Sequence, residues 1–172
     1  GYGERAHRYV GGGIVALDGA LDGAGEAGLR VVLDLHAAPG CQNGFDNGGM
    51  LDVCEWHTRE EYLAHSVDVL GRLAARYAAV PSLDAIQVLN EPRWDIPTDL
   101  LKGFYRRAYG AIRAHCGPEQ VAVVFHDGFR PQGEYAGFFQ PPGFDNVLYD
   151  VHRYQCFERA DLDLDNHGHL HK

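Results

Sequence analysis

Hydrophobic residues follow two alternating patterns along this chain. Short, nearly continuous apolar runs, typical of buried strands, occupy residues 30–36, 85–89, 121–125 and 146–152. Between them, apolar residues recur every three or four positions, which predicts helices over about 12–27, 58–77 and 98–117. The charged stretch after Glu158 resembles the start of another helix. Strands that alternate with helices are typical of βαβ units, so the pattern predicts an α/β fold with parallel strands.

Local signals mark where some of these helices begin and end. Thr58 and Glu61 have the spacing of a capping box, and Thr98 is a candidate cap for the next helix. Gly28 suits the end of the first helix, because glycine readily adopts the left-handed conformation found there. Residues 37–57 are rich in Gly, Asn and Asp and follow neither pattern, so we expect a long loop.

Polar residues collect where each predicted strand ends. The pairs are Asp34 and His36, Asn90 and Glu91, His126 and Asp127, and His152 and Tyr154. In a doubly wound sheet such residues would gather at one switch point, whereas a barrel draws its active site from all of its strand ends. The distribution therefore favours a barrel. No glycine-rich phosphate loop follows any strand, so nucleotide binding is not expected.

Length and charge restrict the class of protein and its partners. With 172 residues, 45% of them hydrophobic, the chain suffices for one core, and we expect residues 1–172 to form a single domain. The net charge of −9 disfavours nucleic acid and anionic membrane as partners. No apolar stretch approaches the roughly 20 residues of a membrane span. Residues 1–5 contain no apolar signal core, which favours the cytoplasm unless a leader precedes Gly1.

The motif Leu89-Asn90-Glu91-Pro92 is the most informative segment. An apolar run ends there at a carboxyl group with an amide beside it, and Pro92 cannot continue a strand ladder. Glu91 would thereby point from the carboxyl end of the strand, where barrels keep their chemistry. The alternative is a surface loop that happens to contain a glutamate.

Four segments, in this order, resemble glycoside hydrolase family five, whose members are retaining TIM-barrel glycosidases, and most of all its exo-β-1,3-glucanase branch. They are Asp34-Leu35-His36-Ala37-Ala38-Pro39-Gly40, Gln42-Asn43-Gly44-Phe45-Asp46-Asn47, Leu89-Asn90-Glu91-Pro92 and Asp150-Val151-His152-Arg153-Tyr154-Gln155. The resemblance assigns the four strands to barrel positions three to six, and so implies a partial (β/α)8 TIM barrel of about four βα units. It implies a hydrolase that acts on β-glucan oligosaccharides and needs no cofactor or metal.

The resemblance also implies roles for individual residues. Glu91 matches the general acid/base, a carboxyl that donates a proton and later accepts one. The residues matched to substrate binding are Asn90 at the sugar 2-hydroxyl, His36 at the −1 sugar, the strand-six pair His152 and Tyr154, the subsite residue Asn47, and Phe45 and Phe157, which clamp the outgoing sugar.

Simpler roles stay open for several of these side chains. A histidine at a strand end is often a hydrogen-bonded structural residue, and Phe45 and Phe157 could anchor loops. His126 and Asp127 could hold a strand end without touching a ligand. Trp56 and Trp94 could each line the cleft or pack in the core.

The chain departs from the family pattern in its extent. Strands one, two, seven and eight have no counterpart, and the nucleophilic glutamate belongs to strand seven, beyond Lys172. A retaining mechanism needs two carboxyl groups about 5–5.5 Å apart. We therefore expect a natural truncation, an excised fragment or a piece of a longer gene product.

A half-barrel leaves two strand edges unpaired and its inner face open. We expect a homodimer that closes an eight-stranded barrel. The alternative to a hydrolase is a catalytically inactive or sugar-binding barrel fragment.

Overall fold

A sheet of four parallel strands forms the centre of the protein, whose computed structural model describes residues 11–157, 159–165 and 167–168. The strands are β1 (Val31–Asp34), β2 (Leu83–Gln87), β3 (Ala122–His126) and β4 (Val147–Asp150), and they neighbour one another in chain order. The helices α1 (Gly13–Glu26), α2 (Glu60–Tyr77) and α3 (Thr98–Arg113) precede β1, β2 and β3 in turn, and the short α4 (Arg159–Leu162) follows β4. The prediction of a partial (β/α)8 barrel is confirmed.

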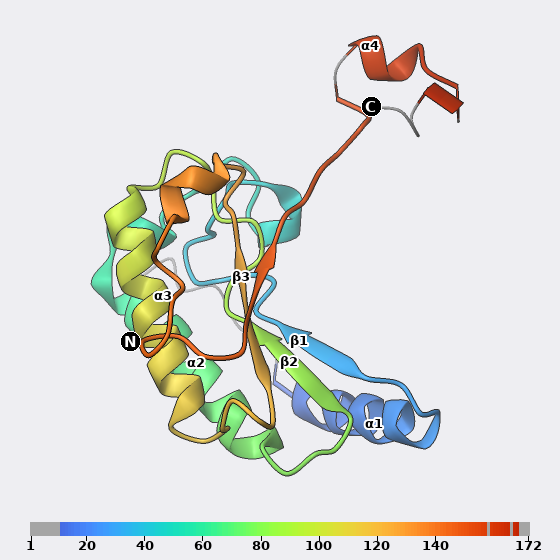
Figure 1. The fold of residues 1–172 in the computed structure, drawn as a ribbon, viewed down its shortest axis with the longest axis vertical. Coiled ribbons are helices and arrows are strands. Elements are labelled where there is room, and N and C mark those ends of the chain that lie inside the picture. The colour runs from blue at the N-terminus through green and yellow to red at the C-terminus, as the bar shows by residue number, and fades with distance from the viewer. Residues whose placement is uncertain (1–10, 158, 166, 169–172) are drawn as a thin grey trace.

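The two faces of the sheet differ in what covers them. Figure 1 shows α2 and α3 together on one side of the sheet, and α4 beyond the carboxyl ends of the strands. Side chains that face the helices, such as Ile86 and Phe125, are fully buried. On the other face Val32 and Leu148 are 52% and 53% exposed. This second face corresponds to the inner wall of a barrel, and the described residues cover it only partly.

Helix α1 ends next to Gly28, the glycine that the sequence indicates for this position. Gly28 has a φ of 70°. Its amide donates to the carbonyl of Gly25 at 3.1 Å, and the amide of Leu29 donates to that of Ala24 at 2.8 Å. These two bonds form a Schellman motif, which satisfies carbonyls that the helix end would leave unpaired.

Two predicted helix caps are wrong, in each case because the threonine hydroxyl has another partner. Thr58 lies in a 3-10 turn (Trp56–Thr58) before α2, and its hydroxyl donates to the carbonyl of Glu55 at 2.7 Å. Thr98 is already the first residue of α3, and its hydroxyl donates to Glu134 at 2.9 Å. That Glu134 bond joins residues far apart in sequence, which a local capping rule does not consider.

The chain after β2 keeps close to the sheet for three more residues before it turns. The amide of Val88 donates to the carbonyl of Val124, and the amide of Asn90 donates to that of Leu35, both at 3.1 Å. Glu91 follows with a φ of 44°, in the left-handed region that few non-glycine residues adopt. The ladder thus ends at Gln87, earlier than the apolar run suggests, while the turn falls at the carboxyl group as expected.

The cysteines and the lengths of the helices complete the description of the fold. All four cysteines are free thiols. Within the described ranges, no helix combines the length and apolar character that a membrane crossing requires.

Candidate active site

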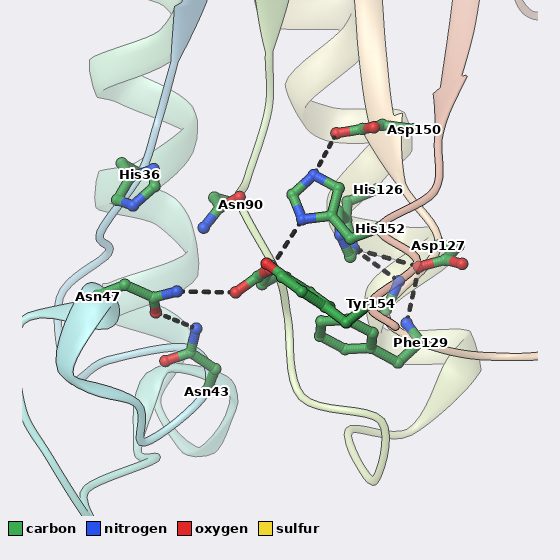
Figure 2. Close-up of polar contacts among 12 residues, drawn as sticks. His36, Asn43, Asn47, Asn90, His126, Asp127, Phe129, Asp150, His152 and Tyr154 are labelled. Carbon is green, nitrogen blue, oxygen red and sulfur yellow. Dashed lines mark hydrogen bonds and ion pairs between the residues drawn. The ribbon is translucent and has the colours of Figure 1, made fainter. Parts of the chain in front are cut away.

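Glu91 is held by three hydrogen-bond donors that come from two other segments of the chain. Asn47 donates its amide to Oε2 at 2.8 Å, and the Tyr154 hydroxyl donates to Oε1 at 2.9 Å. The His152 ring bonds through Nδ1 to the same Oε1 at 2.8 Å. Figure 2 shows Asn47 approaching from the loop after β1, and His152 and Tyr154 from the segment after β4. The Glu91 side chain is only 5% exposed, so its orientation is set by these bonds.

The second nitrogen of His152 faces another carboxylate. Nε2 lies 3.0 Å from Oδ2 of Asp150, and the same oxygen accepts a hydrogen bond from the Gln87 amide at 2.9 Å. Asp150 and His152 are two residues apart, so they point to the same side of an extended chain. Asp150, His152 and Glu91 therefore form a continuous chain of polar contacts along the carboxyl edge of the sheet.

These contacts determine the charges of Glu91 and His152. Burial raises the pKa of Glu91, but hydrogen bonds from His152, Asn47 and Tyr154 outweigh it and the net shift is downward. Burial lowers the pKa of His152, but the bonds and charges of Glu91 and Asp150 outweigh it and the net shift is upward. The two shifts have the signs expected of an ion pair between the Glu91 carboxylate and the His152 imidazolium.

We expect this pair to stabilise the fold most between about pH 4.5 and 6.5, the ordinary pKa values of the two groups. The pKa of Glu91 is lowered, so its contribution is complete above pH 4.5 and lost as the pH falls through the folded-state value. The pKa of His152 is raised, so its contribution is complete below pH 6.5 and lost as the pH rises through the folded-state value. Urea unfolding should show a larger loss of stability in His152→Gln at about pH 5.5 than at about pH 8.5. An equal loss at both would contradict the ion pair.

A buried glutamine, Gln42, holds the backbone around this arrangement in place. Gln42 is fully buried, and its side-chain amide donates to the carbonyls of His36 and Asn90, both at 2.9 Å. Its Oε1 accepts from the amide of Ala38 at 3.1 Å. Gln42 thereby ties the loop after β1 to the residue that precedes Glu91. Sequence reasoning included Gln42 in a motif but assigned it no role.

Asn43 orients one of the Glu91 donors. Its amide donates to Oδ1 of Asn47 at 2.9 Å, which leaves the Asn47 amide free to face Glu91 (Figure 2). Its own Oδ1 accepts from the backbone amide of Phe45 at 2.9 Å. The loop after β1 is therefore fixed by its own polar side chains at the point where it meets Glu91.

His126 lies beneath His152 and is fully buried. The two ring centroids are 4.3 Å apart and the planes are nearly perpendicular, at 86°. Nδ1 of His126 accepts a hydrogen bond from the amide of Gly128 at 2.9 Å, and burial together with the charge of His152 lowers the pKa of His126. The lowered pKa favours the neutral ring, in which Nδ1 accepts from Gly128 and Nε2 carries the proton, and His126 supports His152 by packing.

Glu91, His126 and His152 each place a potential metal-ligating atom within 4.8 Å of the others. Three of the four ring nitrogens already have polar partners, and Nε2 of His126 is buried without a hydrogen-bond partner among the described residues. Both nitrogens of His152 face carboxylates, and in the neutral ring that the lowered pKa favours, Nε2 of His126 carries the proton. A neutral histidine binds a metal through an unprotonated nitrogen. The donor set therefore fits a hydrogen-bonded cluster better than a metal centre.

Glu91 opens onto a cleft of about 1050 Å³. The predicted site residues in its wall are Phe45, Asn47, Glu91, His152, Tyr154 and Phe157. His36 and Asn90 lie beside it. The His36 ring is 58% exposed and contacts Asp34 at 2.7 Å, and Figure 2 shows the Asn90 amide between His36 and His152. The structure thus brings all eight predicted residues to one edge of the sheet, six of them into one cleft.

The two tryptophans, which the sequence did not separate, have different surroundings. Trp56 is fully buried, donates to the Ser66 hydroxyl at 3.1 Å and packs edge-on against Phe104, so its role is in the core. Trp94 is 56% exposed and lines the cleft, as do Leu51 and Phe129, for which the sequence offered no signal.

Comparison with known proteins bears on this site. The family model for cellulase (glycosyl hydrolase family 5) matches residues 13–164. The chain belongs to glycosyl hydrolase family 5. "Probable glucan 1,3-beta-glucosidase A" of Aspergillus terreus is 40% identical over 155 residues, which are 87% of this chain and 36% of the relative. "Glucan 1,3-beta-glucosidase" of Blumeria graminis is 36% identical over 94% of this chain and 38% of its own length.

Solved structures show where this family 5 chain fits in the fold. Rutinosidase from Aspergillus niger superposes with a TM-score of 0.74 at 18% identity, over 87% of this chain and 46% of that one. Endoglucanase Cel5A from Thermotoga maritima gives a TM-score of 0.63 at 16% identity, over 89% and 45%. The chain spans less than half the length of each of these relatives, in agreement with four βα units of an eight-unit barrel.

Proposed function

We propose that this chain carries the acid/base half of a glycoside hydrolase that acts on β-glucans, either β-1,3-glucan or related β-glucosides. The observation that carries the proposal is Glu91, nearly buried at the wall of a wide cleft and held there by three donors. Membership of family 5 and the names of its glucan 1,3-beta-glucosidase relatives support the choice of substrate.

In the proposed reaction Glu91 first protonates the glycosidic oxygen of the leaving sugar and then removes a proton from water. As the leaving sugar departs, a second carboxyl about 5–5.5 Å away must attack the anomeric carbon, and the deprotonated water later displaces that carboxyl from the sugar. We assign that group to the part of the barrel that β1 to β4 do not form. Its negative charge would raise the pKa of Glu91 and so supply the protonated acid that the first step needs.

The roles of the other predicted residues follow from their positions around Glu91. Asn90 is fixed through its backbone and would bind the sugar 2-hydroxyl, a contact that strengthens in the transition state. His36 would bind the same sugar from the β1 side. Tyr154 and His152 orient Glu91, and Asn47 links it to the loop after β1.

Phe45 and Phe157 are expected to clamp the leaving sugar, since both line the cleft and the Phe157 side chain is 79% exposed. Phe45→Ala and Phe157→Ala should therefore weaken binding of an oligosaccharide more than binding of glucose, measured by calorimetry. Val15→Ala, on the exposed side of α1, is the control and should change neither the affinity for the oligosaccharide nor that for glucose. Equal losses for both ligands would make these aromatics structural.

A homodimer is the proposed way for two copies to close the barrel. Val32 and Leu148 lie half-exposed on the inner face, and parallel sheets rich in such residues are normally covered on both faces. A twofold axis would place β4 of one copy beside β1 of the other. Sedimentation at micromolar concentration should give a dimer, and a monomer that unfolds cooperatively would contradict this.

Sugar binding without hydrolysis is the second candidate. The observation in its favour is the net downward shift of the Glu91 pKa beside His152, which leaves the carboxyl protonated less often than an ordinary glutamate. In that case the cleft would bind β-glucan and release it unchanged.

Assays with p-nitrophenyl β-glucoside and laminarin, combined with a measured molecular mass, separate these candidates. The proposed hydrolase should release p-nitrophenol or glucose at a rate that depends on Glu91. Saturable binding of laminari-oligosaccharides with no product would support the second candidate instead. Absence of both binding and product would contradict both.

A further inference from the structure

Trp94 is an exposed aromatic residue on a well-anchored segment. It follows Glu91 by three residues and belongs to the loop between β2 and α3, yet its side chain is 56% exposed. The ring centroid lies 6.3 Å from that of Phe45, with 36° between the planes. Phe45 comes from the loop after β1, so two separate loops present these rings in the wall of one cleft.

The residues on either side of Trp94 hold the backbone in place. The Arg93 guanidinium bonds Asp95 twice, at 2.6 and 2.9 Å, and the Arg93 amide donates to the carbonyl of Gln42 at 3.0 Å. Ile96 is buried at 1% exposure. The indole therefore projects into solvent from a fixed point, and binding a ligand would cost it little conformational entropy.

The surroundings of Trp94 favour a sugar over other apolar ligands. Asp46 and Asn47 lie in the same wall and offer groups that can bind hydroxyls. In β-linked glucose all ring substituents are equatorial, so each face of the ring presents only C–H groups. Such a face packs well on the electron-rich face of an indole.

We propose that Trp94, together with Phe45, forms an outer sugar-binding platform next to the proposed leaving-sugar clamp of Phe45 and Phe157. The inference rests on the proposed function and deepens it. Trp94 would contact a glucosyl unit one step further from Glu91 than the clamped sugar does, so the preferred substrate is an oligosaccharide of three or more units. Removing the indole should therefore affect long ligands and spare short ones.

Tryptophan fluorescence offers a direct test, because the chain has two tryptophans and Trp56 is fully buried. Quenching by iodide should report almost entirely on Trp94. In a Glu91→Gln background, which prevents turnover, laminaritetraose should protect the indole from iodide while laminaribiose protects it weakly. The Trp94→Phe variant should lose the signal and keep most of the affinity, since phenylalanine preserves an aromatic face.

Calorimetry on the same background provides the measurement of affinity. Trp94→Ala should raise the Kd for laminaritetraose about tenfold, which corresponds to about 1.4 kcal/mol, and the Kd for laminaribiose less than about twofold. Equal changes for both ligands, or no change for either, would overturn the platform while leaving the proposed function standing. If the Glu91→Gln protein with Trp94 intact bound neither ligand, both the platform and the proposed function would be contradicted.

Discussion

Replacing Glu91 with glutamine is expected to lower kcat on laminarin by about 10²–10⁴-fold, the usual contribution of a general acid/base. Glutamine has nearly the same shape, and its carbonyl oxygen can still accept bonds from His152 and Tyr154. It cannot donate a proton to a glycosidic oxygen or remove one from water. Far-ultraviolet circular dichroism and the unfolding midpoint should show that the fold survives.

The dependence on the leaving group separates acid catalysis from general damage to the site. An aryl glycoside with a good leaving group needs little protonation, so its first step should lose less in Glu91→Gln than a poor leaving group does. Glu119→Gln, at an exposed position, is the matched control and should keep the wild-type rate. A wild-type rate for Glu91→Gln on a poor leaving group would remove Glu91 from the mechanism.

Replacing Gln42 with alanine is expected to destabilise the protein by about 2–5 kcal/mol. Gln42 is fully buried and makes three hydrogen bonds to backbone groups, two of them to the carbonyls of His36 and Asn90 in the segments that follow β1 and β2. Alanine would leave these groups without their partner, and a buried unpaired group costs about 1–3 kcal/mol. Urea unfolding monitored by circular dichroism measures the loss.

An exposed glutamine supplies the comparison for this substitution. Gln132→Ala should change the free energy of unfolding by less than about 0.5 kcal/mol, as surface substitutions usually do. A loss below about 1 kcal/mol in Gln42→Ala would show that water replaces the amide, and that Gln42 does not hold the Asn90–Glu91 segment.

Hydrophobic periodicity was sufficient to predict the order of strands and helices and the parallel sheet, because each strand carries an apolar run between amphipathic helices. Gly28 and the turn at Glu91 were predictable for local reasons, namely the left-handed conformation of glycine and the exclusion of Pro92 from a ladder. The caps at Thr58 and Thr98 were not, since their hydroxyls bond other residues, and Glu134 is far from Thr98 in sequence.

The candidate site was predictable in its members but not in its contacts. The motifs indicated Glu91, His152 and Tyr154, whereas the ion pair of Glu91 with His152 depends on a fold that joins residues 61 positions apart. Nothing in the sequence distinguished Trp56 from Trp94, because each tryptophan lies in a loop that follows a strand. Burial separates them, and burial is a property of the folded chain.

The most direct test of Glu91 as the acid/base of a retaining glycosidase is chemical rescue of Glu91→Ala by azide on an activated aryl β-glucoside. Azide needs no general base, so it can attack the anomeric carbon and displace the nucleophilic carboxylate that the rest of the barrel supplies from the glycosyl intermediate. We predict faster turnover and a β-glucosyl azide product, whose configuration matches that of the substrate. In a preparation whose unsubstituted form hydrolyses the aryl glucoside, turnover of Glu91→Ala that azide does not accelerate, or a product with inverted configuration, would contradict the assignment of Glu91.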